Sequence, residues 1–305
     1  MRRVSERIGV HVLRVACILA SSVIVFIAIA IIVGALPILT SRGLELFSRT
    51  WDPNSGKYGI LPFIAGSLFV VGVALMIAIP IGVLSALFVV EYSPRKIREF
   101  LESLFQVNFS IPSVIYGFWA LVFIVPLLRE SIQPFLSSTL GFIPLFSGKP
   151  RGFGVMAAGL VLAIMITPLI VAISIEVMKL VPEELKLSAY AIGASKTEVA
   201  FKITLRVAFP GIAAAILLSL GRAIGETMAV LWVTGNVAII PKSLFDPCYV
   251  LTSVLVNEFG ASVGDPYHTS ALFAVALILL LISVVFVAIS KMIILHMERK
   301  FRGRK

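Results

Sequence analysis

The sequence has few charged residues. Only 14% of its 305 residues are Asp, Glu, Lys or Arg, whereas 59% are hydrophobic and the mean hydropathy is +1.05. A soluble chain carries roughly 25% charged residues. The shortage excludes an ordinary water-soluble enzyme and indicates that most of the surface of this chain faces lipid.

Cysteine and histidine are scarce as well. The chain has two cysteines, and Cys17 and Cys248 fall in regions that the topology separates, so no disulfide framework is expected. The three histidines are isolated from one another and from any carboxylate cluster. The sequence therefore gives no support to a metal site.

Long uncharged runs occupy more than half of the chain. Because a bilayer core is ~30 Å thick, a spanning helix needs about 20 apolar residues. A sixth run, 207–241, holds only the charges Arg222 and Glu226. The pattern predicts six transmembrane helices and excludes a transmembrane β-barrel, which would show short alternating segments. The five runs without any charge are 15–41, 58–90, 103–128, 152–175 and 269–290.

The distribution of Lys and Arg predicts how the chain is oriented. With six spans, both tails and the second and fourth loops hold 18 of the 26 basic residues, and the opposite loops hold seven. Cytoplasmic loops carry the excess positive charge, so both termini are expected in the cytoplasm. The net charge of +10 then reflects topology and contact with anionic lipid, and no nucleic-acid partner is expected.

Arg222 and Glu226 are the one charged pair inside an apolar run. On a helix, a spacing of four residues puts both side chains on one face, where they can neutralise each other. In one interpretation Arg222 faces a polar path and offers its guanidinium to an oxyanion. In the other, the pair only locks two helices together.

The loop at 176–206 is too long for a turn and alternates charged with apolar residues. A helix is expected to begin at Pro182 and to end near Gly193, where a second helix begins. Such a helical hairpin either lies on the membrane surface or docks to a cytoplasmic partner. The stretch GASKT at 193–197 lacks the first glycine and the strand of a phosphate-binding loop, so another chain must bind any ATP.

The same loop resembles the EAA loop of ABC importer permeases. LSAYAIG at 187–193 and ITL at 203–205 follow the motif, with Leu187 in place of its acid and Arg206 in place of its proline. A contact made by the acid of the family therefore does not transfer to this chain.

Further segments resemble phosphate importer permeases of the PstC type, over nearly all of the chain from about Gly66 onward. These segments are IPSVIYG at 111–117, GLVLAIM at 159–165 and GRAIGETMAV at 221–230. The Gly-Glu-Thr-Met-Ala-Val ending favours this type over the paralogous PstA type, whose segment usually reads Gly-Glu-Thr-Ala-Pro.

The resemblance implies an all-α polytopic membrane protein with the type I importer (MetI-like) architecture. It implies a PstA-type second permease, two PstB-type cytoplasmic ATPase subunits that bind ATP and Mg, and an extracytoplasmic phosphate-binding protein. This chain would bind no cofactor, would not be an enzyme, and would work by alternating access in a prokaryotic inner or plasma membrane.

Two sets of residues follow from the resemblance. Arg222, Glu226 and Thr227 are expected at the translocation path, and Ala189, Tyr190, Ala191, Gly193 and Ala194 at the contact with the ATPase.

We expect residues 1–57 to form a tail, the first span and an outward loop, and residues 58–305 to form the permease core. The outward segments 42–57, 129–151 and 241–268 lack long helical patterns and are expected to seat the binding protein or to act as solvated connectors.

Other functions fit the same residues. A permease for sulfate, molybdate or tungstate would share the architecture and differ in its binding protein and in the side chains along its path. A membrane scaffold or regulatory subunit that conducts nothing would tolerate apolar residues at 222 and 226.

Overall fold

The computed structural model describes residues 2–108 and 111–302, and the side chains of residues 11–108, 111–289, 291 and 292. Several tail cations that enter the charge comparison therefore lie outside the described side chains. They are Arg2, Arg3, Arg7, Arg299, Lys300, Arg302, Arg304 and Lys305.

The described chain is almost wholly helical. In order, its elements are α1 (Arg2–Arg42), η1 (Gly43–Phe47), β1 (Trp51–Asp52), η2 (Pro53–Ser55), β2 (Lys57–Tyr58), α2 (Leu61–Glu91), α3 (Arg95–Asn108), α4 (Ser113–Trp119), η3 (Ala120–Ile124), α5 (Val125–Leu127), η4 (Leu128–Ile132), α6 (Gln133–Leu140), η5 (Pro144–Phe146), α7 (Val155–Lys179), α8 (Glu183–Ala191), α9 (Lys196–Glu198), η6 (Val199–Thr204), α10 (Leu205–Gly225), α11 (Met228–Leu231), α12 (Leu251–Ser262) and α13 (Pro266–Arg302). The segments η3, η4 and η6 are π-helical, and η1, η2 and η5 are 3₁₀ turns.

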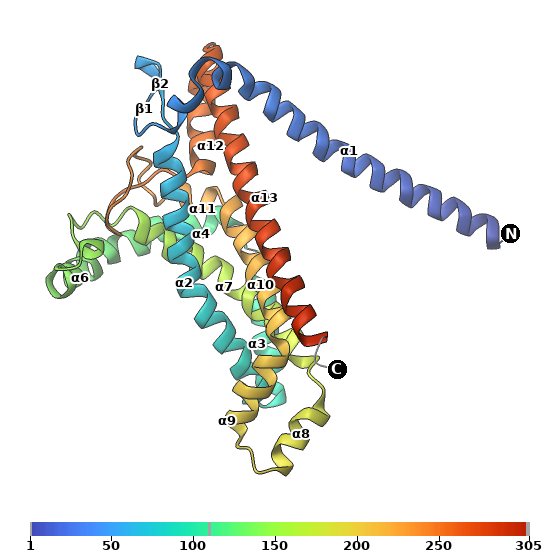
Figure 1. Ribbon diagram of the computed structural model, residues 1–305. Coiled ribbons are helices and arrows are strands. Elements are labelled where there is room, and N and C mark those ends of the chain that lie inside the picture. The colour runs from blue at the N-terminus through green and yellow to red at the C-terminus, as the bar shows by residue number, and fades with distance from the viewer. Residues whose placement is uncertain (1, 109–110, 303–305) are drawn as a thin grey trace.

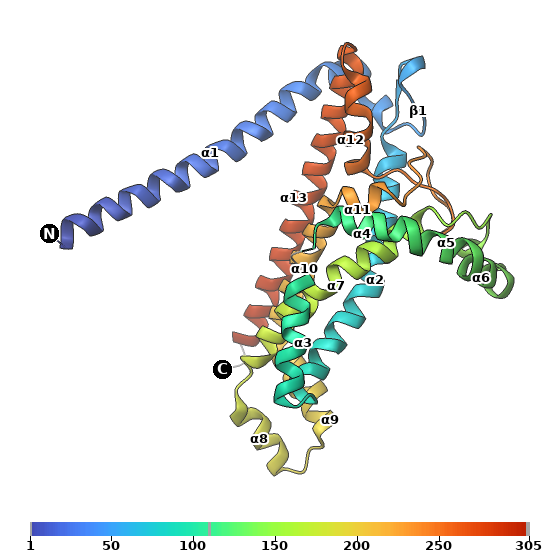
Figure 2. The ribbon, with the colours of Figure 1, turned by 180° about the vertical axis from the view of Figure 1, so that it is seen from behind.

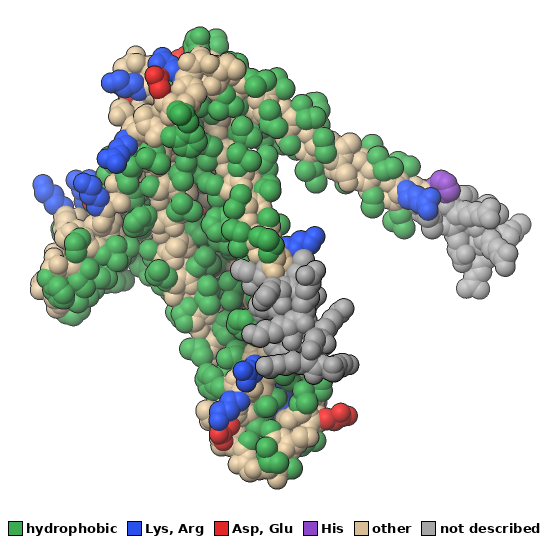
Figure 3. Space-filling model, viewed as in Figure 1, with side chains coloured by type: hydrophobic (Ala, Val, Ile, Leu, Met, Phe, Trp, Pro, Cys, Tyr) green, Lys and Arg blue, Asp and Glu red, His purple; other side chains and the backbone are tan. Residues whose placement is uncertain are grey.

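Six helical segments are long and apolar enough to cross a membrane, as predicted. Within the described residues they are His11–Phe47, Leu61–Glu91, Ser113–Leu140, Val155–Lys179, Lys196–Gly225 and Pro266–Ile289. Figure 3 agrees with this assignment, because hydrophobic side chains cover most of the visible face between the two ends of the bundle. The all-α, six-helix architecture is therefore confirmed.

The third and fifth spans have different limits from the uncharged runs. The run 103–128 takes in the end of α3, and the span begins only at Ser113 and continues to Leu140. It passes through Arg129 and Glu130, which neutralise each other in an ion pair (Nη2 to Oε1, 2.8 Å). The run 207–241 is divided at Gly225, where α10 ends.

The core of the bundle lies where α7 packs between α2 and α10 (Figure 1). α7 is the most deeply buried of the six spans: two thirds of its most apolar 18-residue stretch is buried inside the protein. It is apolar all round, which is the expected pattern for a helix surrounded by other helices. Packing around α7 therefore sets the positions of α2 and α10, the two helices that approach the loop at 176–206.

α1 leaves the bundle and projects away from it in both ribbon views (Figures 1 and 2). Only its C-terminal part packs on the bundle, against α13. There Ser270 Oγ donates to the carbonyl of Gly34 (2.8 Å) and accepts from the amide of Ile38 (3.1 Å), next to Pro37. A side chain inserted at a proline satisfies backbone groups that the helix itself leaves open.

The end of the bundle near β1 and β2 is here called the hairpin end (Figure 1). Two of the three predicted outward segments contain more helix than the sequence indicates. The segment 241–268 includes α12, and the segment 129–151 includes α6, so the expectation of non-helical outward loops is wrong for both. Turn-forming residues near the ends of these two segments hid the helical patterns of α12 and α6 in the sequence. Segment 42–57 does form the expected turns, with a small antiparallel hairpin that pairs Trp51 with Tyr58.

Candidate functional site

A helix break lies at residues 225–227, within the apolar run 207–241. α10 ends at Gly225, Glu226 has an extended conformation (φ −71°, ψ 130°), and the short helix α11 begins at Met228. Broken helices at membrane depth occur where the backbone is buried in protein or lines a cavity. This break therefore marks a place where a polar path can meet the bundle.

The polar groups of Glu226 and Thr227 hold the break in shape. Glu226 Oε1 accepts the amide of Ala229 (3.2 Å) in the first turn of α11, and the Glu226 carbonyl accepts from Thr252 Oγ1 of α12 (2.8 Å). Thr227 Oγ1 donates to the carbonyl of Gly225 at 3.4 Å. These bonds satisfy backbone groups that helix ends leave unpaired.

The expectation that Arg222 and Glu226 share one helix face is wrong. α10 ends between them, so the spacing of four residues no longer sets their geometry. Among the described side chains, no ion pair joins the two residues. The Arg222 side chain is exposed at the end of α10, and Glu226 is half-buried beneath α11.

Arg222, in the last turn of α10, lies within electrostatic range of Tyr116 of α4. Tyr116 in turn donates to Asn108 Oδ1, which ties α4 to the end of α3. α4 approaches α11 closely at Gly117, where a Cβ atom would lie 2.7 Å from Trp232 Cδ1 and 2.9 Å from the carbonyl of Met228. The environment of Arg222 therefore depends on α4 and α11 as well as on α10.

The coupling segment, defined as residues 176–206, lies at the α8 end of the molecule, opposite the hairpin end (Figure 1). α8 follows Pro182, with Glu183 and Glu184 in its first turn. It ends where Gly193 adopts φ +87° and donates to the Tyr190 carbonyl (2.9 Å), while Ala194 donates to the Ala189 carbonyl (3.0 Å). The start and end of the first predicted helix are thus confirmed.

The second helix of the coupling segment is not separate. Ser195 and Glu198 form a capping box, in which Ser195 Oγ accepts the amide of Glu198 and the Glu198 carboxylate accepts the amide of Ser195. From there α9, η6 and α10 form one helical run. A displacement at residue 195 therefore acts directly on the helix whose far end carries Arg222.

The five predicted coupling residues lie together around the end of α8. Ala189 is buried against the bundle, Tyr190, Ala191 and Gly193 are exposed, and Ala194 is half-buried. Leu187, at the position of the family's acid, is 59% exposed, and Ile192 is 87% exposed. This end of the loop thus presents apolar side chains outside the bundle.

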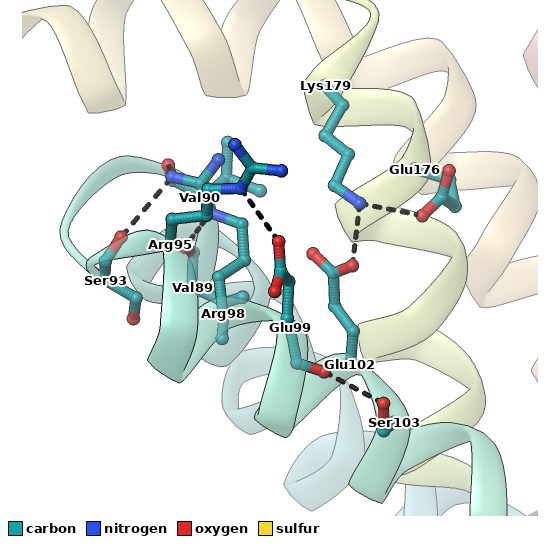
Figure 4. A network of polar contacts seen from close by, with 10 residues as sticks. All are labelled: Val89, Val90, Ser93, Arg95, Arg98, Glu99, Glu102, Ser103, Glu176 and Lys179. Carbon is teal, nitrogen blue, oxygen red and sulfur yellow. Dashed lines mark hydrogen bonds and ion pairs between the residues drawn. The ribbon is translucent and has the colours of Figure 1, made fainter.

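No pattern in the sequence indicated the corner between α2, α3 and α7. Arg98 of α3 donates from Nε to the carbonyl of Val89 (3.1 Å) and from Nη2 to the carbonyl of Val90, at the C-terminal end of α2 (Figure 4). Lys179 of α7 bridges Glu102 of α3 (2.9 Å) and Glu176 of its own helix (3.1 Å). These contacts fix α3 against two spans.

A cavity of about 390 Å³ lies beside this corner. Its walls are Glu102 and Gln106 of α3 and an α7 face that ends at Glu176. Among the described residues, no group of three His, Cys, Asp or Glu residues is placed to hold a metal ion.

The comparisons with known proteins define the class of this chain. Residues 78–302 match the model of the binding-protein-dependent transport system inner membrane component. The match covers well over half of the chain, so the chain belongs to this family. It is a multi-pass inner-membrane protein with the fold of ABC importer permeases.

The most similar relatives include two phosphate transport system permease proteins PstC. The chain is 42% identical to that of Pasteurella multocida (strain Pm70), over 85% of this chain and 82% of the relative. It is 37% identical to that of Mesorhizobium japonicum, over 94% and 89%. A solved bacterial alginate ABC transporter in complex with a pentasaccharide-bound periplasmic protein matches with a TM-score of 0.56 at 17% identity, over 94% of both chains, and supports the fold alone.

Proposed function

We propose that this chain is the PstC-type permease subunit of an ATP-driven phosphate importer and forms half of its translocation pathway. The observation that carries the proposal is its 42% identity, over most of its length, to a phosphate transport permease. The exposed Arg222 beside a broken helix supplies the matching chemistry. Because phosphate is a strongly hydrated anion, a guanidinium on its path compensates part of the hydration that it loses.

Arg222, Glu226 and Thr227 are the proposed residues of the path. Arg222 is the anion-facing group, since its side chain is exposed and carries no ion pair within the described residues. Glu226 holds α11 through the Ala229 amide, and its carboxylate would accept a hydrogen bond from a P–OH group. Thr227 closes the last turn of α10 and keeps the break in place.

Ala189, Tyr190, Ala191, Gly193 and Ala194 are the proposed contact with the ATPase. The exposed apolar residues Leu187 and Ile192 beside them support docking to a protein partner. ATP binding would close the ATPase pair, move α8, and rearrange α10, the helix that carries Arg222 in its last turn. This chain itself would bind no ATP or Mg and would catalyse no reaction.

The proposed complex contains a PstA-type second permease, two PstB-type ATPase subunits and an extracytoplasmic phosphate-binding protein. The described part of α1 supports the presence of a second membrane chain, because its most apolar 18-residue stretch has no residue buried inside this protein. The hairpin end, with α12 and the arm formed by α5 and α6, is the proposed seat of the binding protein. Both termini and α8 would then face the cytoplasm.

The proposed domain division keeps residues 1–57 apart from a permease core at 58–305. The projection of α1 from the bundle supports it, as does the start of the family match at residue 78.

The test is ATP-dependent uptake of labelled phosphate into proteoliposomes that hold all four kinds of subunit. Arg222→Ala should abolish uptake while the complex still assembles, and Arg222→Lys should keep part of it. Arg95→Ala is the matched control, because the Arg95 side chain is 91% exposed and pairs with Glu99 at the surface. Surface pairs of this kind contribute little to stability, so uptake should be unchanged.

Each other function gives a distinct result in the same assay. Uptake of sulfate, molybdate or tungstate without phosphate would assign the chain to another oxyanion. An assembled complex that moves no anion would indicate a scaffold. Normal uptake by Arg222→Ala would remove Arg222 from the path.

A further inference from the structure

Glu91, the last residue of α2, joins three elements through one carboxylate oxygen. Its Oε1 accepts a hydrogen bond from Lys186 Nζ of α8 (2.7 Å) and another from Thr204 Oγ1 of η6 (2.6 Å). The Glu91 side chain is 6% exposed and that of Lys186 is 13% exposed. Thr204 is fully buried.

The Glu91–Lys186 ion pair differs in kind from the Lys202–Glu198 pair of the coupling segment. Lys202 and Glu198 are separated by one helical turn on a single helix, and their side chains are 69% and 46% exposed. Surface pairs have little effect on stability, whereas removal of one partner of a buried pair leaves an uncompensated charge. Glu91 and Lys186 are therefore expected to stay joined when α8 moves.

The end of α2 also holds the coupling segment at a second point. Tyr92 donates from its hydroxyl to Thr197 Oγ1 (3.2 Å), and Lys196 Nζ lies 5.1 Å from the centre of the Tyr92 ring. Arg98 binds the last carbonyls of α2 from the other side (Figure 4). The end of α2 is thus braced on α3 and attached to the loop before and after Gly193.

We propose that Glu91 is a positioning residue that transmits movement of α8 to α2 and to the base of α10. Lys186 connects Glu91 to α8, and Thr204 connects it to the helical run that carries Arg222 in its last turn. Thr204 ends the π-helical segment η6, and such segments often occur at functional sites. The inference rests on the proposed function, because it assumes that α8 receives the movement of an ATPase.

The first test measures phosphate transported per ATP hydrolysed in proteoliposomes that hold the complete complex. Glu91→Gln and Lys186→Met should each lower this ratio about fivefold or more, the range typical of coupling between sites. Glu99→Gln and Lys202→Met are the matched controls, since both residues form exposed pairs, and their ratio should equal that of wild type.

A double variant separates transmission from stability. In Glu91→Gln/Lys186→Met no charge is left unpaired, so the melting temperature should recover relative to either single variant. The transport ratio should remain low, because the connection is still absent. If the ratio recovers together with the melting temperature, Glu91 only stabilises the fold and the proposal is overturned.

The second test does not depend on the transported anion. Spin labels at Ser188→Cys on α8 and Lys96→Cys on α3, in a Cys17→Ala background, report the distance between the coupling helix and the end of α2. In the complete complex, with and without ATP, this distance should stay narrowly distributed, and Glu91→Gln should broaden it. A distribution in Glu91→Gln as narrow as in wild type would overturn the proposal.

Failure of the proposed function gives a different pattern. If the wild-type complex moves sulfate and not phosphate, the ratio to measure is sulfate transported per ATP hydrolysed. The Glu91 and Lys186 variants then test the inference about Glu91 in the same way. If the wild-type complex transports nothing, the spin-label comparison alone decides whether Glu91 holds α8 to α2.

Discussion

At the scale of single residues, the polar groups that matter are those that tertiary contacts bring to a helix end. Glu226 bonds to α11 and leaves Arg222 exposed, although the two residues are close in sequence. Cys248 illustrates the opposite case, because burial raises the pKa of its thiol to about 12 and leaves it without a reactive thiolate. The residue type alone predicts neither outcome.

Gly117 offers a test of the packing beside Arg222. Gly117→Ala would place a Cβ 2.9 Å from the carbonyl of Met228 and 3.0 Å from the Cα of Ala229, so the backbone of α4 or α11 must shift. We expect a loss of about 1–3 kcal/mol in stability, as for other overpacked sites, and a loss of phosphate uptake. Melting of the purified chain and uptake by the complex measure the two effects.

Gly72→Ala is the control for this change. Gly72 is also inside a helix, but nothing lies within 4 Å of an added Cβ. Alanine should stabilise α2 slightly there. Equal effects of the two variants would contradict a close approach at Gly117.

At the scale of elements, the coupling segment is a helix closed by a glycine turn and followed by a long helix. α8 needs the turn at Gly193 because the chain must reverse before Ser195 caps the next helix. The apolar pattern predicted α8 correctly, but it placed a boundary between the second short helix and the fifth span, where the structure has a continuous helical run.

Gly193→Val should destabilise the turn after α8, because valine strains the left-handed backbone conformation at this position. A left-handed conformation costs a residue with a side chain roughly 1–2 kcal/mol, and no atom lies within 4 Å of an added Cβ. We expect reduced retention of the ATPase on the permease, measured by co-purification. Gly193→Asn should retain it, because asparagine tolerates this conformation. Loss of the ATPase in both variants would instead indicate that the partner requires a bare glycine surface.

At the scale of the whole molecule, the bundle is a core of buried helices with α1 attached at one end. α7 is enclosed by its neighbours, whereas α1 packs only near Gly34 and Ile38. A helix so exposed contributes little to the fold of its own chain. In a bilayer, its free side is available to lipid or to another subunit.

Deletion of residues 2–30 should therefore leave the bundle folded and weaken its association with the second permease. We expect a melting temperature close to that of the full chain and a lower yield of the second permease on co-purification. A variant that carries a Leu-Ala helix in place of residues 11–30 controls for membrane insertion. Collapse of the bundle in both variants would show that α1 is part of the folded core.

The sequence by itself determined the six spans, the break in composition at the coupling segment and the class of protein. It could do so because the length and apolar content of a segment decide whether it enters a bilayer, and because the motif at 187–205 is local. Helix ends inside apolar runs were harder to predict. The chain stops α10 at Gly225 because Ala229 and Thr252 offer polar partners to Glu226, and Thr252 lies beyond the run itself.

Only the tertiary structure decided which charges meet. Arg222 and Glu226 are four residues apart and separate, whereas Glu91 and Lys186 are 95 residues apart and form a buried pair. Within one helix the spacing sets the geometry, but a helix break removes that constraint. Between helices, only tertiary packing brings a carboxylate and an ammonium group together: α2 and η6 share a core with α7, and α8 packs on η6.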